Sequence, residues 1–241
     1  MCHDIDSRPP APPQRRPAEP AESIRLTSAD GTIFPAFRAA PTGPSTASVI
    51  LLPDVRGAHP FYRALTERFA ETGCATVAID YYGRTAASED RGADFPWQEL
   101  LPQLRPAEVT ADVHAAVDEL RAQHDGPVFV VGFCFGGGQS WRLASSDLGL
   151  AGVVGFYGLP QPAREVAQTA TVPVLMLLAG ADVATPQSDF DALAVELASE
   201  TEMHVYPGAP HSFFDRGHAE WADACTDAWN RILAFIARHS S

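Results

Sequence analysis

The sequence predicts an α/β fold with a mostly parallel central sheet and helices on both of its faces, and three observations support this. Short apolar runs of strand length alternate along the chain with longer stretches whose apolar residues recur at helical spacing. The run at residues 128–131 is apolar and mostly β-branched, as is typical of a strand buried on both faces. The same run, Val128–Val131, leads into Gly132-Phe-Cys134-Phe-Gly136, after which a helical pattern begins. The alternation predicts a single layered domain over residues 23–241.

Composition agrees with one globular domain and argues against several classes of partner. The chain has 241 residues, 46% of them hydrophobic and 20% charged, which allows a sizeable core. A formal net charge of −13 argues against nucleic acid or an anionic membrane surface as partner. The longest apolar run, Val172 to Ala181, falls short of the ~20 residues that a membrane span needs. The four cysteines are widely spaced and no signal-peptide pattern is visible, so we expect reduced thiols and a cytoplasmic protein.

The other elements can be placed in chain order. Residues 1–22 are rich in proline and poor in large apolar side chains, so we expect them to form a disordered tail. The first two strands flank Ala29-Asp30-Gly31 and are predicted to form a hairpin at the sheet edge. Further strands are predicted at residues 48–53, 75–80, 150–157, 172–179 and 203–206, and helices at 61–69, 109–120, 192–197 and 221–232. No insertion is long enough for a large cap domain.

The first candidate for chemistry is the cysteine between the two glycines. Strand, Gly-x-nucleophile-x-Gly and helix together make the nucleophile elbow of the α/β-hydrolase fold, here with Cys134 in place of serine. Glycine is needed because side chains two positions either side of the nucleophile would collide in so tight a turn. The positive end of the following helix favours thiolate over thiol. The alternative is a glycine-rich turn around a buried structural cysteine.

Two more residues lie where such a fold places the partners of its nucleophile. Asp182 follows the strand at 172–179 and His211 follows the strand at 203–206, and the carboxyl ends of parallel strands share one edge of a sheet. The chain order of nucleophile, acid and histidine is also that of the fold. Alone, Asp182 could be a turn or capping residue and His211 a solvated loop residue. Together the three positions predict a catalytic triad. The other histidines have no comparable context, so no metal site is predicted.

The chain resembles the dienelactone hydrolases (carboxymethylenebutenolidases) from residue 23 to the carboxyl terminus. The resemblance rests on Leu52-Pro-Asp54-Val-Arg-Gly57, Asp80-Tyr-Tyr-Gly-Arg84, Gly132-Phe-Cys134-Phe-Gly-Gly137, Gly155-Phe-Tyr-Gly158, Gly180-Ala-Asp182 and His211-Ser-Phe-Phe-Asp-Arg216. It implies an α/β-hydrolase fold, no cofactor, and a triad of Cys134, His211 and Asp182. It also implies an oxyanion hole formed by the backbone N–H groups of Val55 and Phe135.

The same resemblance implies a role for an acid beside the nucleophile. The family has a glutamate where this chain has Asp54, poised to take the thiol proton when substrate arrives. If Asp54 faces Cys134, its charge raises the thiol pKa and keeps the resting cysteine unreactive. If it pairs instead with Arg56, two positions on, it only braces the loop.

Substrate-binding residues are also implied by the resemblance. In the family two arginines hold a substrate carboxylate, and Arg84 matches the first of them by motif. At the second position this chain has Asp215, followed by Arg216. We therefore expect Arg84 and Arg216 to bind an anionic group, and Tyr82 and Phe213 to line the pocket. The alternatives are ordinary surface charges for the arginines and loop packing for the phenylalanine.

The predicted function is hydrolysis of a small, dienelactone-like ester or lactone through a thioester intermediate. His211 would shuttle the proton while Asp182 fixes the tautomer of the imidazole. One alternative is a hydrolase or tailoring enzyme that acts on a larger, polyketide-like lactone or ester. The other is a redox-sensing or binding protein that uses Cys134 without hydrolysis. An acid–histidine pair argues against the latter, and the sequence gives no oligomeric state.

Overall fold

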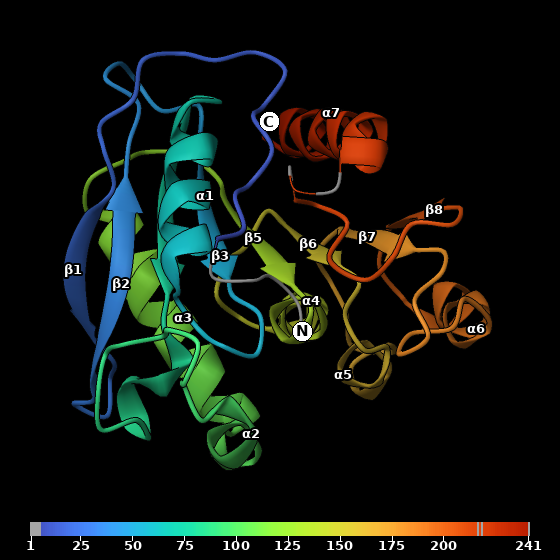
Figure 1. Cartoon of the computed structure of the whole chain (residues 1–241), viewed down its shortest axis with the longest axis horizontal. Helices are drawn as coiled ribbons and strands as arrows, with labels where there is room; N and C mark the ends of the chain where they lie inside the picture. The colour runs from blue at the N-terminus through green and yellow to red at the C-terminus, as the bar shows by residue number, and fades with distance from the viewer. Residues whose placement is uncertain (1–5, 216, 218, 241) are drawn as a thin grey trace.

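The computed structural model describes residues 6–215, 217 and 219–240, and a single eight-stranded sheet runs through its centre (Figure 1). The strands are β1 (Glu22–Thr27), β2 (Ile33–Ala39), β3 (Ala47–Leu52), β4 (Cys74–Ile79), β5 (Val128–Phe133), β6 (Gly152–Phe156), β7 (Val174–Ala179) and β8 (Thr201–Tyr206). Their order in the sheet is β1-β2-β4-β3-β5-β6-β7-β8. The hairpin of β1 and β2 is antiparallel at one edge, and all pairs from β4 to β8 are parallel. The predicted mostly parallel sheet is therefore confirmed.

Helices cover both faces of the sheet. They are α1 (Pro60–Ala70), α2 (Trp97–Leu100), α3 (Pro106–Arg121), α4 (Phe135–Arg142), α5 (Gln161–Glu165), α6 (Ser188–Glu196) and α7 (Ala222–Arg238). The large buried hydrophobic residues of α1 and α7 belong to one core cluster, whereas those of α3, α4 and α6 belong to the other, on the opposite face (Figure 1). Successive side chains of β3 alternate between the two clusters, as the period of a strand requires. The helix α5 was not predicted from the sequence.

The turn from β5 into α4 brings two backbones into direct contact. A Cβ atom on Gly136 would lie 2.1 Å from the carbonyl oxygen of Leu52 and 2.5 Å from that of Pro53, at the end of β3. A Cβ on Gly132 would lie 1.9 Å from the carbonyl oxygen of Gly136. Only glycine fits at these distances. The glycines that the sequence pattern required thus hold the start of α4 against the end of β3.

The beginning of the chain differs from the prediction of a disordered tail over residues 1–22. In the structure the described part of this segment, residues 6–21, runs along the domain toward β1, with three proline rings buried at positions 9, 10 and 12. The indole N–H of Trp229 donates to the carbonyl of Pro10 at 3.2 Å, and the Arg16 N–H donates to the carbonyl of Glu71 at 2.7 Å. Proline loses little backbone freedom on ordering, so modest burial offsets its entropy cost. Composition alone does not show whether burial of the proline rings outweighs the entropy lost when the segment becomes ordered.

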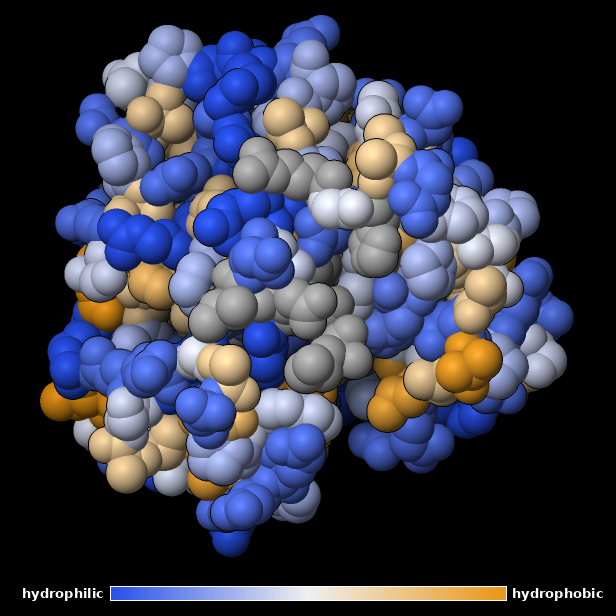
Figure 2. Space-filling model, in the orientation of Figure 1, coloured by the Kyte–Doolittle hydropathy of each residue, from blue (hydrophilic) through white to orange (hydrophobic). Residues whose placement is uncertain are grey.

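Polar side chains cover most of the face drawn in Figure 2, and hydrophobic groups form small, separate patches on it. Among the described residues, the large hydrophobic side chains with the greatest exposure are Ile33, Leu159, Val183 and Val195. In the same ranges no helix combines the length and the apolar character that a membrane crossing requires.

The contact at Gly136 leads to a stability prediction. Gly136→Ala should lower the free energy of unfolding by at least ~2 kcal/mol, because the added methyl group meets backbone atoms that cannot rotate away. Gly43→Ala is the matched control, since a Cβ at this exposed glycine meets nothing within 4 Å. Thermal unfolding should show a fall of about 4–8 °C for Gly136→Ala and almost none for the control. Equal melting temperatures for the two variants would contradict the close approach.

Candidate active site

The candidate nucleophile occupies the turn between β5 and α4. Cys134 has φ 54° and ψ −113°, a positive φ that non-glycine residues rarely adopt and that usually marks a functional constraint. Its N–H donates to the carbonyl of Phe156 at 3.0 Å, and its own carbonyl accepts the N–H of Gly138 at 3.2 Å. The side chain is partly buried at the amino end of α4, beside the first-turn N–H groups of that helix. The other described cysteines are buried, and burial raises the pKa of Cys225 to about 12.

The candidate acid and histidine lie within hydrogen-bonding distance of each other. Nδ1 of His211 is 2.5 Å from Oδ2 of Asp182, whose side chain is 1% exposed. The N–H of Ala184 and the hydroxyl of Thr185 also donate to this carboxylate, at 2.9 and 2.7 Å. Burial alone would raise the pKa of Asp182, but the hydrogen bonds from His211 and Thr185 lower it below its usual value. The carboxylate is therefore ionised at neutral pH and can accept a hydrogen bond from Nδ1–H of His211.

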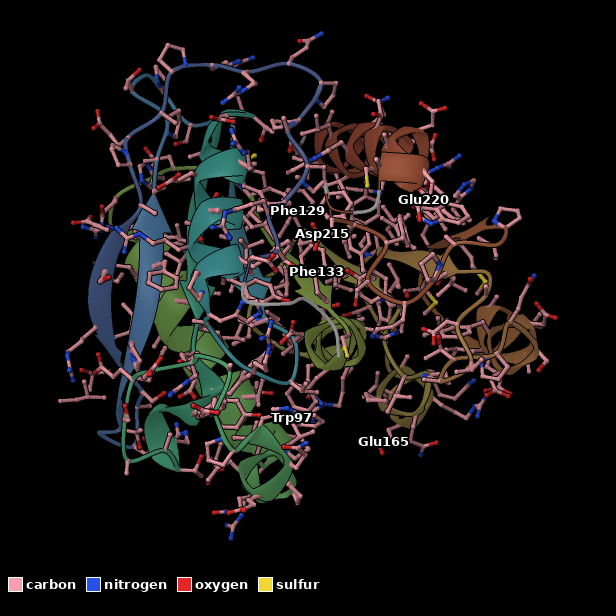
Figure 3. The ribbon with its side chains drawn as sticks, in the orientation of Figure 1. Trp97, Phe129, Phe133, Glu165, Asp215 and Glu220 are labelled. Carbon is pink, nitrogen blue, oxygen red and sulfur yellow. The ribbon has the colours of Figure 1, made fainter. Side chains whose placement is uncertain are left out.

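Aromatic packing holds His211 next to the turn that carries the cysteine. The ring of Tyr157 lies 4.8 Å from the ring of His211, and Tyr157 directly follows Phe156, which accepts the Cys134 N–H. In the histidine loop, residues 207–215, the ring of Phe214 lies 5.8 Å from that of Phe133 at the end of β5. Figure 3 shows Phe133 and Asp215 in the central part of the molecule. The structure thus brings the elements that carry Cys134, Asp182 and His211 to the same edge of the sheet.

Two backbone N–H groups near the cysteine are available for a ligand. The carbonyl of Pro53 accepts the N–H of Gly136 at 3.1 Å and the hydroxyl of Tyr81 at 2.8 Å, which joins the start of α4 to the loop after β3. Phe135 is the first residue of α4, and the first-turn N–H groups of a helix have no intrahelical acceptor. For Val55 and Phe135, the described part of the chain offers no acceptor within hydrogen-bonding distance of either N–H. These are the two donors that the sequence resemblance implies.

Asp54 begins that loop as a fully buried carboxylate. Oδ1 accepts the backbone N–H of Arg56 at 2.8 Å, and Oδ2 lies 3.2 Å from Nε2 of His59. The predicted partner Arg56 therefore engages Asp54 through its main chain, and a histidine that the sequence did not single out makes the side-chain contact. Asp54 and Cys134 both lie close enough to Tyr81 to add to the effect of burial, which raises the pKa of its phenol.

Arg84 lies in a partly buried ionic cluster at the edge of the sheet. Its Nη2 is 2.6 Å from Oδ1 of Asp112 on α3, and its Nη1 pairs with Asp30 in the β1–β2 turn and with Thr32. The side chain of Arg84 is 9% exposed and that of Asp112 is 1% exposed. Ser28 donates a further hydrogen bond to Asp112. The guanidinium is thus committed to two acids, and the structure does not bring it to the group around Cys134.

The remaining predicted substrate-binding residues also differ from expectation. Tyr82 is fully buried, and its hydroxyl donates to the carbonyl of Val55. Phe213 is fully buried as well, with its ring 4.7 Å from that of Tyr206, so it packs the loop. Arg216 lies outside the described residues. The preceding residue, Asp215, accepts the N–H groups of Gly217 at 2.9 Å and of Arg8 at 3.4 Å.

Potential metal ligands gather elsewhere. Within the ranges that the structure covers, Glu200, Glu202 and His239 bring ligand atoms within 4.8 Å of one another. They lie around the amino end of β8, whereas Cys134 lies beyond the carboxyl end of β5. Glu202 also pairs with Arg238. This group of acids and one histidine therefore has no part in the candidate active site.

Sequence reasoning missed three residues of the site: His59, Tyr157 and Thr185. Tyr157 has a positive φ of 35°, and it lies in Gly155-Phe-Tyr-Gly158, a motif that supported the family resemblance but did not point to the histidine. Thr185 follows Asp182 by three residues, a spacing at which a hydroxyl can reach back to a carboxylate. His59 precedes Pro60 at the start of α1, and its position at a helix boundary was its only distinguishing feature.

Comparison with known proteins identifies the family of this chain. Residues 34–240 match the profile of the dienelactone hydrolase family. The chain belongs to this family. It is therefore a carboxylic ester hydrolase with the α/β-hydrolase fold, and its substrates are small esters or lactones.

Individual relatives are similar over nearly the whole chain. A carboxymethylenebutenolidase of Rhodococcus opacus is 28% identical, over 99% of this chain and 97% of its own. A provisionally named carboxymethylenebutenolidase of Saccharolobus solfataricus is 28% identical, over 88% of this chain and 96% of its own. The crystal structure of a provisionally named dienelactone hydrolase from Klebsiella pneumoniae superposes with a TM-score of 0.78 at 27% identity, over 91% of this chain and 99% of that one.

The placement of Arg84 leads to a prediction about stability and its pH dependence. Arg84→Met should lower the free energy of unfolding by about 3 kcal/mol at neutral pH, because it leaves the Asp112 carboxylate buried without its cation. Burial raises the pKa of Asp112 above its usual value, and loss of Arg84 raises it further. The penalty for the buried charge is absent once Asp112 is protonated in both folded and unfolded protein, and it grows as pH rises through the folded pKa. Melting temperatures should therefore differ more between wild type and variant at pH 7.5 than at pH 5.

The same variant separates a structural role from substrate binding. Arg84→Met should change KM by the same factor for a carboxylate-bearing lactone and for a neutral aryl ester. The double variant Arg84→Met/Asp112→Asn should regain part of the lost stability, because the unpaired charge is gone. A selective rise in KM for the carboxylate-bearing substrate would show instead that Arg84 contacts substrate.

Proposed function

We propose that this hydrolase cleaves small activated esters or lactones with Cys134 as nucleophile, His211 as general base and acid, and Asp182 as the group that orients the histidine. The observation that carries the proposal is the 2.5 Å contact between the buried Asp182 and His211, on the loop packed beside the Cys134 turn. An acid that fixes one ring nitrogen directs the other nitrogen toward a reacting group.

The reaction would proceed in two stages. The sulfur of Cys134 attacks the ester carbonyl carbon, its proton passes to Nε2 of His211, and the negative charge moves to the carbonyl oxygen. The N–H groups of Val55 and Phe135 stabilise this oxyanion, and collapse of the intermediate expels the alcohol or enol with the proton from His211. Water then attacks the thioester, with His211 again taking and returning a proton, and the acid product leaves.

The chemistry of cysteine restricts the range of substrates. A thiolate is a better leaving group than an alkoxide, so the first tetrahedral intermediate collapses forward only if the substrate's own leaving group departs easily. Enol lactones and aryl esters meet this condition, whereas amides do not. With Arg84 paired with Asp112 and Asp30, a substrate carboxylate would have to bind another cation, and the candidate is Arg216, one position after the second arginine position of the family.

Replacement of the nucleophile tests the proposal directly. Cys134→Ala should reduce kcat/KM for p-nitrophenyl acetate and for cis- or trans-dienelactone by at least about 1,000-fold, a loss of ~4 kcal/mol of transition-state stabilisation. Cys225→Ala is the control, because this buried thiol has a raised pKa and should be chemically inert. Activity of Cys134→Ala within about tenfold of wild type would exclude covalent catalysis by this residue.

The intermediate and the rival functions can be separated in the same set of measurements. If the reaction with a slow aryl ester is quenched rapidly during turnover, mass spectrometry should find the peptide that contains Cys134 heavier by the mass of the acyl group. Parallel assays with larger lactones test the alternative of a tailoring enzyme. If peroxide oxidises Cys134 rapidly while none of these esters acylates it, the protein is a redox sensor instead.

A further inference from the structure

We infer that His59 is a positioning residue for the oxyanion hole: it holds the Asp54 carboxylate, and the carboxylate in turn fixes the direction of the Val55 N–H. The inference rests on the proposed function, because it concerns an oxyanion donor of the reaction proposed above. It assigns a role to a residue that neither touches substrate nor belongs to the triad.

The first step concerns the backbone N–H groups of the loop formed by residues 54–58. The N–H of Arg56 donates to Oδ1 of Asp54 at 2.8 Å, and the N–H of Gly57 donates to the main-chain carbonyl of Asp54 at 3.0 Å. Asp54 thus accepts two successive donors of the turn that it begins. Between Asp54 and these donors lies Val55, whose N–H is left for a ligand. The direction of that N–H is set by the turn, and the turn is set by Asp54.

The second step concerns what holds Asp54 itself. Its side chain is fully buried, and a buried carboxylate is costly unless charged or polar partners surround it. Nε2 of His59 lies 3.2 Å from Oδ2, opposite the oxygen that accepts the Arg56 N–H. Because an ionised carboxylate only accepts hydrogen bonds, we assign the proton of the imidazole to Nε2. Nη2 of Arg56 lies 3.4 Å from the same nitrogen, and because both atoms then carry protons this contact is not a hydrogen bond.

The third step concerns the rigidity of the support. His59 is the residue just before α1, and it is 1% exposed. The neighbouring ring of Tyr62 packs edge-on against the imidazole at 4.9 Å, and the Tyr62 hydroxyl accepts the N–H of Asp54 at 2.8 Å. Helix α1 is anchored in the core through Phe61, Leu65 and Phe69. His59 therefore connects the 54–58 loop to a packed helix, as precise positioning of a donor requires.

These contacts also bear on whether Asp54 acts as a mobile acid. A proton-accepting gate must move toward the sulfur, which would break the contact with His59 and release the turn that presents Val55. With one oxygen held by a main-chain N–H and the other facing a buried imidazole, the carboxylate is built as a brace. The two roles predict different behaviour of the Cys134 thiol, and the experiment uses that difference.

The experiment compares His59→Phe with His59→Gln. Phenylalanine keeps a ring to pack against Tyr62 but loses the donor, whereas the glutamine amide nitrogen can reach the position of Nε2. If His59 positions the oxyanion donor, His59→Phe should lower kcat for p-nitrophenyl acetate by about 30-fold or more, toward the 10²–10³-fold cost of losing one donor. The kcat of His59→Gln should be at least about fivefold higher than that of His59→Phe, and KM should change little for either variant.

The rate of alkylation of Cys134 distinguishes a positioning role of His59 from a general structural defect. Iodoacetamide reacts with the thiolate by displacement of iodide and forms no oxyanion, so labelling of Cys134, followed by mass spectrometry, should proceed within about twofold of wild type in both variants. His114→Gln, at an exposed histidine on α3, is the control for histidine replacement. If His59→Phe fails to fold, His59→Asn replaces it, because its amide is too short to reach Oδ2.

The outcomes are distinct. Wild-type kcat in His59→Phe, or a labelling rate that changes in parallel with kcat, overturns the inference, and the latter would show that Asp54 acts on the thiol. If wild-type protein shows no esterase activity, the proposed function fails, and amide hydrogen exchange then tests the brace alone. In that test His59→Phe should accelerate exchange at Arg56 and Gly57 by at least about tenfold, and unchanged exchange overturns the inference.

Discussion

The candidate active site depends on one contact between two backbones. The absence of a side chain at Gly136 lets the start of α4 touch the Leu52 and Pro53 carbonyls at the end of β3. That contact sets the distance between Phe135, whose N–H belongs to the helix, and Val55, whose N–H belongs to the loop after β3. It also forces the strained backbone of Cys134, because the chain must reverse within a few residues. Side-chain chemistry at the site can operate only because this packing is in place.

Electrostatic pairing around the site relies on arginine, and the chain contains no lysine. The planar guanidinium can meet a carboxylate through more than one N–H, which suits buried pairs. Arg91, for example, donates from Nε to the buried Asp80 at 2.8 Å and lies 4.4 Å from the centre of the Phe95 ring. Asp80 also accepts the Tyr82 N–H at 2.9 Å, so this pair supports the tyrosine whose hydroxyl binds the 54–58 loop. The net charge of −13 gives the protein as a whole no long-range attraction for an anionic substrate.

The sequence was most informative where function follows from topology. The carboxyl ends of parallel strands share an edge, so Cys134, Asp182 and His211 could be grouped from strand positions alone. It was less informative for long side chains: Arg84 leaves the expected strand end, but its guanidinium turns toward Asp112, whose position on α3 no local pattern reveals. The contact between His59 and Asp54 was not predicted from the sequence for a related reason. A buried histidine is defined by the carboxylate it faces, and neither burial nor its partner is visible in a loop sequence.

The segment at residues 6–21 ties the beginning of the chain to its end. Arg8 and Pro10 contact Asp215 and Trp229, which are separated from them by 207 and 219 positions in sequence. On a ribosome these contacts cannot form until the histidine loop and helix α7 have both emerged. Residues 6–21 must therefore wait for partners that are made more than 200 positions later, one of which lies in the loop that carries His211. In a chain that is still being made, this loop lacks the contact with Arg8 that it has in the folded protein.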